Sequence, residues 1–204
     1  MTSTEVTTLI GLDTGVYDVT TSSGTYHVID LDRQSATRYG ALGHEWTEHS
    51  SPDGVPDTEP FFFTRLSDAA VGRRMYLFNK GGYLDSDYWR LTSEIQRIAP
   101  HQWDFDALEE TWSLTSAQMS ELLGVDTMTY AMWHLTDVPV EHRRQVEVLE
   151  AITFLLERRV KAVSIAQSLR RPLPAFSDRS LLEMARAGEF HLLAAAVRSL
   201  PRDN

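Results

Sequence analysis

Two histidines in one short segment are the first side chains whose type could bind a metal. The segment runs from His44 to His49 and also contains Glu45 and Glu48. The two histidines of a helical metalloprotease motif stand four residues apart, where one helix face presents both. Histidines five residues apart fall on different faces, so we interpret the segment as a polar loop and expect no metal site.

Pairs of neighbouring acids are the second candidates, because two carboxyl groups can divide the roles of general acid and general base. Asp85 with Asp87 and Asp104 with Asp106 have suitable spacing, but 29 acids among 204 residues produce such neighbours without any catalytic role. The chain has no cysteine, which excludes thiolate nucleophiles, cysteine-bound zinc and iron-sulfur sites. We therefore expect no catalytic residue, no cofactor and no enzymatic activity.

The charge balance bears on possible partners. The chain carries 19 Lys and Arg against 29 Asp and Glu, a formal net charge of -10. Nonspecific coating of nucleic acid needs cationic side chains, so this balance argues against it. No apolar run approaches the length of a membrane span, and the first residues lack the pattern of a signal peptide. We expect a cytoplasmic protein that does not enter a membrane.

The first half of the chain has the alternation of β-strands. Residues 16–21 and 25–31 are rich in β-branched and aromatic side chains, and Ser22, Ser23 and Gly24 between them predict a hairpin turn. Further strands are expected at residues 36–39, 61–63 and 73–78, and from Trp89 onward, where Trp89, Leu91, Ser93 and Ile95 are expected on one face. The pattern predicts five or six antiparallel strands in a small sheet or barrel.

The second half repeats at helical spacing. Helix starts are expected at Asp104, at the capping-box pair Thr115 and Gln118, and at Asp126. The helix after Asp126 is expected to turn Met128, Met132 and Leu135 toward the core. The longest helix is expected to follow Pro139 and to carry apolar residues as far as Val163.

Near the C-terminus, Ser180 and Glu183 form a second capping box, and Gly188 is expected to end the short helix that they begin. A last helix is expected to bury Phe190, Leu193 and Val197. The fold class predicted for the whole chain is α+β, with a β-rich domain over residues 1–98, a linker and first helix over 99–112, and an all-α domain over 113–204.

Residues 114–135 have the pattern of a helix-turn-helix, with a short helix, a turn at Gly124, the apolar Val125 and an N-capping Asp126. A long helix follows, and then residues 171–190, in which Gly188, Glu189 and Phe190 open the last helix. This order resembles the Xre/MbcA/ParS antitoxin family, in which a degenerate helix-turn-helix precedes a small toxin-binding helical domain. The resemblance covers residues 113 to about 200, with the toxin-binding-like segment at 171–200.

The resemblance implies a protein partner such as a toxin enzyme, a homodimer, and double-stranded DNA as a second possible partner. If DNA is bound, Thr127, Thr129 and Tyr130 are expected to face it and Arg143 and Arg144 to hold its backbone. The polar residues that we expect to contact a protein partner are Arg179, Arg186, Glu189 and Arg198.

Two functions stay open at this point. One is an antitoxin-like or transcriptional-regulator-like binding protein that acts through protein contacts and DNA. The alternative is a phage-type or accessory interaction module that keeps the helical fold without reading DNA and uses its acidic β domain as the binding surface. The helix after Asp126 contains no Lys or Arg as far as His134, which favours the alternative.

Overall fold

The computed structural model describes residues 6–39, 60–79 and 88–201, of which residues 79 and 88–90 are described by their backbone alone. The chain divides into two compact units, residues 1–102 and 103–204. The first unit is an antiparallel sheet and the second consists of helices, so the predicted α+β class is confirmed. The segment from His44 to His49 and the pair Asp85 and Asp87 lie outside the described residues.

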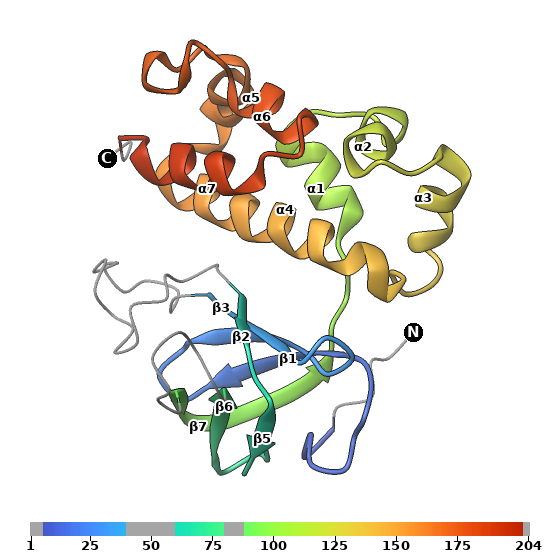
Figure 1. Ribbon diagram of the computed structural model, residues 1–204, viewed down its shortest axis with the longest axis vertical. Coiled ribbons are helices and arrows are strands. Elements are labelled where there is room, and N and C mark those ends of the chain that lie inside the picture. Colours follow the sequence, from blue (N-terminus) through green and yellow to red (C-terminus); the bar gives the residue numbers. More distant parts are fainter. Residues whose placement is uncertain (1–5, 40–59, 80–87, 202–204) are drawn as a thin grey trace. The chain divides into compact units, whose positions relative to one another are not determined.

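The sheet of the first unit has seven strands, in the order β4-β3-β2-β1-β7-β6-β5 (Figure 1). Their bounds are Val16–Thr21 (β1), Tyr26–Asp30 (β2), Ser35–Tyr39 (β3), Pro60–Phe62 (β4), Arg65–Ser67 (β5), Arg74–Asn79 (β6) and Tyr88–Pro100 (β7). Five or six strands were predicted, and β4 corresponds to the strand expected at residues 61–63; β5 was missed because its three residues are too few for an alternating pattern to show in a sequence.

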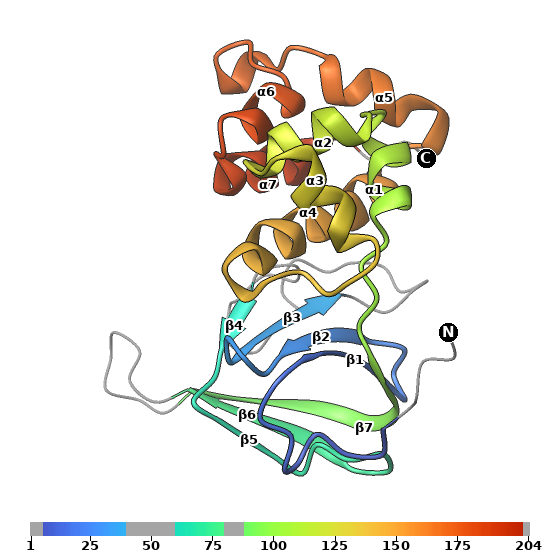
Figure 2. The same cartoon turned by 90° about the vertical axis from the view of Figure 1, so that its right-hand side faces the viewer.

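The sheet curls because its two edge strands follow each other in the chain (Figure 2). Only Phe63 and Thr64 separate β4 from β5. The Phe63 amide donates to the carbonyl of Gln34, beside β3, at 2.8 Å, and the Thr64 amide donates to the carbonyl of Phe78, in β6, at 2.7 Å. The curled sheet encloses a core that includes Val19, Ile29, Met75, Leu77, Ile95 and Ile98.

The predicted hairpin between the first two strands is confirmed. β1 and β2 pair antiparallel, and the Gly24 amide donates to the Thr21 carbonyl at 2.9 Å across the turn. Gly24 has φ +75°, a backbone conformation that L side chains seldom adopt. The glycine therefore sets the turn that the sequence predicted.

The alternation expected along β7 is wrong at one point, because the strand contains a bulge. Arg74 pairs with Glu94 and Tyr76 pairs with Leu91, so β7 has one residue more than β6 between the same two pairings. Leu91 is consequently 38% exposed, while Thr92 is buried. The Thr92 hydroxyl accepts the Met75 amide at 3.0 Å and so gives that amide a partner at the bulge.

The second unit contains seven α-helices among its described residues and a short 3-10 turn (Figure 1). Their bounds are Phe105–Trp112 (α1), Ser116–Leu123 (α2), Thr127–Trp133 (α3), Val140–Arg159 (α4), Ala162–Arg170 (α5), Leu181–Arg186 (α6) and Phe190–Ser199 (α7), with the 3-10 turn at Pro174–Phe176. The predicted caps at Asp104 and Asp126 and both predicted capping boxes are present. Gly124 and Gly188 end their helices with positive φ, as predicted.

The predicted length of the longest helix is wrong. α4 ends at Arg159, because Val160 and Lys161 take extended backbone conformations, and a separate helix, α5, begins at Ala162. Val163, expected on the buried stripe of the long helix, is 92% exposed on α5. Neither a glycine nor a proline marks this break in the sequence.

Candidate functional site

Helix α3 turns the opposite face inward from the one that the sequence predicted. Tyr130 and Trp133 are buried, and the Tyr130 ring packs edge-on against Phe105 of α1 with 5.3 Å between ring centroids. Trp133 also contacts the Phe105 ring, at 6.1 Å. Burying these large aromatic side chains removes more apolar surface from water than burying methionines would. Two opposite faces of α3 are apolar, and the face that carries the aromatic side chains is the buried one.

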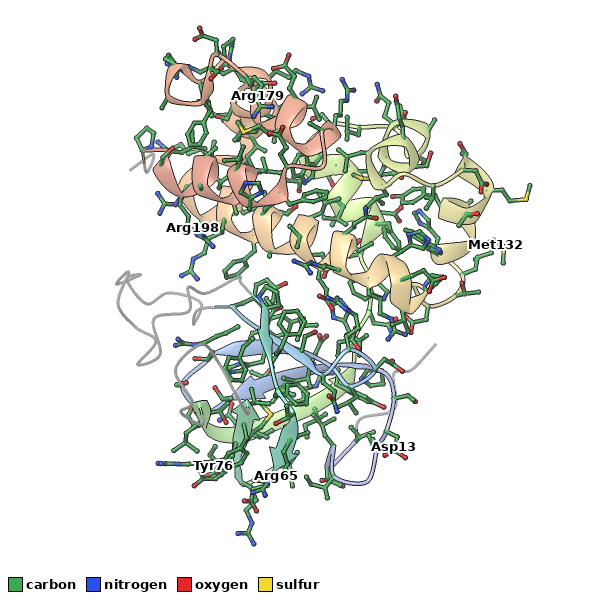
Figure 3. The ribbon with its side chains drawn as sticks, viewed as in Figure 1. Asp13, Arg65, Tyr76, Met132, Arg179 and Arg198 are labelled. Atoms are coloured by element: carbon green, nitrogen blue, oxygen red, sulfur yellow. The ribbon has the colours of Figure 1, made fainter. Side chains whose placement is uncertain are left out.

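The other face of α3 therefore presents its apolar side chains to solvent. Met128 is 77% exposed, Met132 48% and Leu135 81%. Figure 3 shows Met132 pointing away from the helices of its unit. We name these three residues the α3 stripe; Met128 and Met132 lie four residues apart on one face of α3, and Leu135 lies in the turn that follows the end of the helix. Val140, which opens α4, is 40% exposed.

The first turn of α3 is held by Asp126. One oxygen of its carboxylate accepts the amides of Met128 and Thr129, both at 2.9 Å, and the other accepts the Thr129 hydroxyl at 2.6 Å. The Thr129 hydroxyl bond and then the Thr129 amide hold the pKa of Asp126 below its ordinary value. The N-terminus of α3 therefore carries a negative charge at neutral pH.

This cap makes the stability of α3 depend on pH. A carboxyl whose pKa is lowered by folding stabilises the folded state above its unfolded pKa, about 3.9 for Asp, and that contribution is lost as the pH falls below it. We expect the temperature of unfolding, followed by helical circular dichroism, to fall from pH 5 to pH 3. Asp126→Asn keeps a side-chain oxygen for the cap and should flatten this slope. An equally steep slope in the Asn variant would contradict the assignment.

Two of the residues expected to face DNA are buried, and their assignment is corrected. Tyr130 is fully buried; burial raises the pKa of its phenol, and the Glu109 carboxylate raises that pKa further. Arg143 is 6% exposed; its Nε donates to the Val138 carbonyl at 2.9 Å and its Nη2 donates to Asp137 Oδ2 at 2.9 Å. Both side chains hold the fold together instead of reaching outward.

The other three residues named for DNA stay near the surface. Thr127 is exposed, with its hydroxyl 3.4 Å from the Ser120 hydroxyl, and Arg144 is exposed on α4. Thr129 is half-buried, and its hydroxyl is occupied by Asp126. The structure therefore does not bring the five residues together on one surface.

The residues predicted to contact a protein partner also separate. Arg179 and Glu189 form an ion pair, in which each side chain is about one-third exposed. The pair raises the pKa of Arg179 and lowers that of Glu189. Arg198 is half-buried with two guanidinium nitrogens shielded from solvent, whereas Arg186 is exposed. A contact through Arg186 stays a prediction.

Sequence reasoning missed the α3 stripe as a surface because it assigned the stripe to the core. The spacing did predict that the three side chains share one face, and the absence of Lys and Arg near them was the available sign that this face does not meet phosphate. Within residues 6–39, 60–79 and 88–201, no group of three or more metal-ligating side chains comes together. None of the helices described there is both long and apolar enough to cross a membrane.

The fold and the α3 stripe define an α+β protein whose helical unit presents apolar side chains to solvent. No protein-family model matches the chain, and no curated protein matches its sequence. A chain in the crystal structure of the M. tuberculosis MbcT-MbcA toxin-antitoxin complex is similar, with a TM-score of 0.39 and 14% sequence identity. The similarity covers 46% of this chain and 86% of that chain, so it concerns less than half of the protein.

Proposed function

We propose that the protein is a non-enzymatic, antitoxin-like binding protein that acts in the cytoplasm through contacts between its helical unit and a protein partner. The observation that carries this proposal is the exposure of the α3 stripe. Taking a fully exposed Met or Leu side chain out of water contributes about 1.5–3 kcal/mol. Met128 and Leu135 are largely exposed and Met132 is half exposed, so covering the α3 stripe with a protein partner would contribute favourably to binding.

In this proposal α2, Gly124 and α3 form a degenerate helix-turn-helix whose second helix contacts protein in place of a DNA groove. A groove-reading α3 would bring the Asp126 carboxylate toward phosphates and would offer methionines where polar groups read base edges. Arg143, which could have held a phosphate, is bonded within its own unit. The sequence resemblance to Xre/MbcA/ParS antitoxins supports the same kind of partner, a protein such as a toxin enzyme.

The test compares two exposed apolar surfaces of the same unit. Met128→Gln with Met132→Gln replaces two members of the α3 stripe by polar side chains of similar length and good helix propensity. We expect this double variant to unfold at the temperature of the parent protein and to lose the protein that the parent captures from its host. Val163→Gln, on α5, is the matched control and should keep that protein.

The outcome that rejects the proposal is equal capture by the parent and the double variant. A gel shift on the DNA upstream of the coding sequence, repeated at several salt concentrations, tests the DNA alternative in parallel. Binding that weakens steeply with salt and survives both methionine substitutions would assign the helical unit to DNA.

A further inference from the structure

The segment of sequence that carries the α3 stripe is acidic. Residues 98–142, which include α1, α2 and α3, contain eight Asp and Glu and no Lys or Arg. The remainder of the helical unit, residues 143–204, contains seven Asp and Glu and 11 Lys and Arg. The helical unit thus has an acidic part that carries the α3 stripe and a basic part that begins at Arg143, within α4.

Acidic side chains stand at both ends of α3. Asp126 caps its N-terminus, as described above. At the other end, Asp106 lies 3.6 Å from His134, the C-terminal cap residue, and 91% of the Asp106 side chain is exposed. Asp137, two residues after Leu135, is paired with Arg143, whereas Glu141 is exposed in the first turn of α4. The elements next to the α3 stripe thus carry the exposed carboxylates of Asp106, Asp126 and Glu141.

This distribution of charge favours some of the molecules that could cover the α3 stripe over others. Nucleic acid is disfavoured, because its phosphates would approach exposed carboxylates while Arg143 is buried in its pair with Asp137. A second copy related by a two-fold axis would place the same patch against itself, so acids would meet acids across the interface. A partner with apolar anchors and cationic flanks satisfies both the stripe and its charged surroundings.

We propose that the α3 stripe binds a basic amphipathic helix of a partner protein, whose apolar residues pack on Met128, Met132 and Leu135 and whose Lys and Arg face the surrounding carboxylates. Methionine side chains are flexible and adapt to an apolar helix face. Met128 and Met132 lie about one helical turn apart, and Leu135 continues the apolar surface beyond the end of α3, as docking of a helix requires. This inference rests on the proposed function and adds the chemistry of the partner.

The direct test uses two synthetic helical peptides and the full-length protein. Both peptides carry leucines spaced by four and three residues, and their flanking positions hold lysine in one and glutamate in the other. We expect the lysine peptide to bind at least about tenfold more tightly than the glutamate peptide in fluorescence anisotropy, and its affinity to fall with added salt. Equal affinity of the two peptides, or no binding of either, overturns the inference.

Variants locate the binding surface. Asp106→Asn with Glu141→Gln should weaken the lysine peptide by about three- to tenfold. Asp13→Asn with Asp68→Asn makes the same change in net charge on exposed residues of the sheet unit and should leave the affinity unchanged. If both charge variants weaken binding equally, the peptide responds to net charge alone and the inference is wrong.

The double variant Met128→Gln with Met132→Gln distinguishes failure of the basic-helix inference from failure of the proposed protein-binding function. If Met128→Gln with Met132→Gln abolishes capture of the host protein while the lysine and glutamate peptides bind alike, the protein-binding function stands and the basic helix is wrong. If the methionine variant changes neither capture nor peptide binding, both fail. Concentration-dependent self-association that this variant removes, with no peptide binding, would assign the stripe to a second copy of the chain and overturn the inference.

Discussion

Trp112→Ala is expected to lower the free energy of unfolding of the helical unit by about 4 kcal/mol. Trp112 closes α1 and is fully buried, and its indole Nε1 donates to the Thr153 hydroxyl of α4 at 2.8 Å. Alanine would leave a cavity where α1 meets α4 and would remove that hydrogen bond. Such a loss is a large fraction of the 5–15 kcal/mol by which a domain is ordinarily stable.

Denaturant unfolding of the full chain, followed by helical circular dichroism, measures this loss. Thr153→Val is the matched control, because it keeps the volume at the contact and removes only the hydroxyl, which also donates to the Leu149 carbonyl at 2.7 Å. It should cost about 1 kcal/mol. A smaller loss for Trp112→Ala than for Thr153→Val would show that the contact between α1 and α4 is held by the hydroxyl rather than by packing.

The helix starts could be predicted from the sequence because their chemistry is local. In each capping box a hydroxyl and a carboxylate or amide bond the backbone within three residues, as Ser180 and Glu183 do: the Ser180 amide donates to Glu183 at 2.7 Å and the Glu183 amide to the Ser180 hydroxyl at 3.2 Å. Thr115 and Gln118 repeat this arrangement. No distant part of the chain is needed to form either.

The inward face of α3 could not be predicted in the same way, because a distant residue decides it. Periodicity places Met128, Met132 and Leu135 on one side and Tyr130 and Trp133 on the other, and both sides are apolar. Phe105, 25 residues before Tyr130, packs on the aromatic side. The break between α4 and α5 is equally hidden, because a change to extended backbone at Val160 leaves no glycine or proline in the sequence.

The same contrast between features set by neighbouring residues and features set by distant ones applies to the candidate site. The sequence predicted that the three members of the α3 stripe share a face, and it shows no Lys or Arg from Asp126 to His134; both features are local. Whether the face is covered or open depends on how α3 rolls on α1, which the residues of α3 alone do not specify. For this reason the structure changes the interpretation of Met128, Met132 and Leu135 from core residues to exposed ones.

Arg143 and Arg144 are neighbours in the chain, but Arg143 is buried and Arg144 is exposed, so we expect a large loss of stability only when Arg143 is replaced. Arg143→Met should lower the free energy of unfolding by about 2 kcal/mol, because the Val138 carbonyl loses its buried donor and Asp137 loses its partner. The loss is below that of a fully buried ion pair, since Asp137 is half exposed and still accepts the Trp103 indole and the Val138 amide, each at 2.8 Å. Methionine keeps the length and much of the apolar stem of arginine, so the change reports mainly the guanidinium.

Arg144→Met is the matched control and should change stability by less than about 0.5 kcal/mol, because Arg144 is exposed. The pair of variants distinguishes a structural arginine from one that contacts phosphate. If Arg143 fixes the turn between α3 and α4, its replacement lowers stability, and Arg144→Met does not. If Arg143→Met instead leaves unfolding unchanged and removes binding to DNA, the guanidinium leaves Asp137 to reach a phosphate, and the assignment of Arg143 to the interior is wrong.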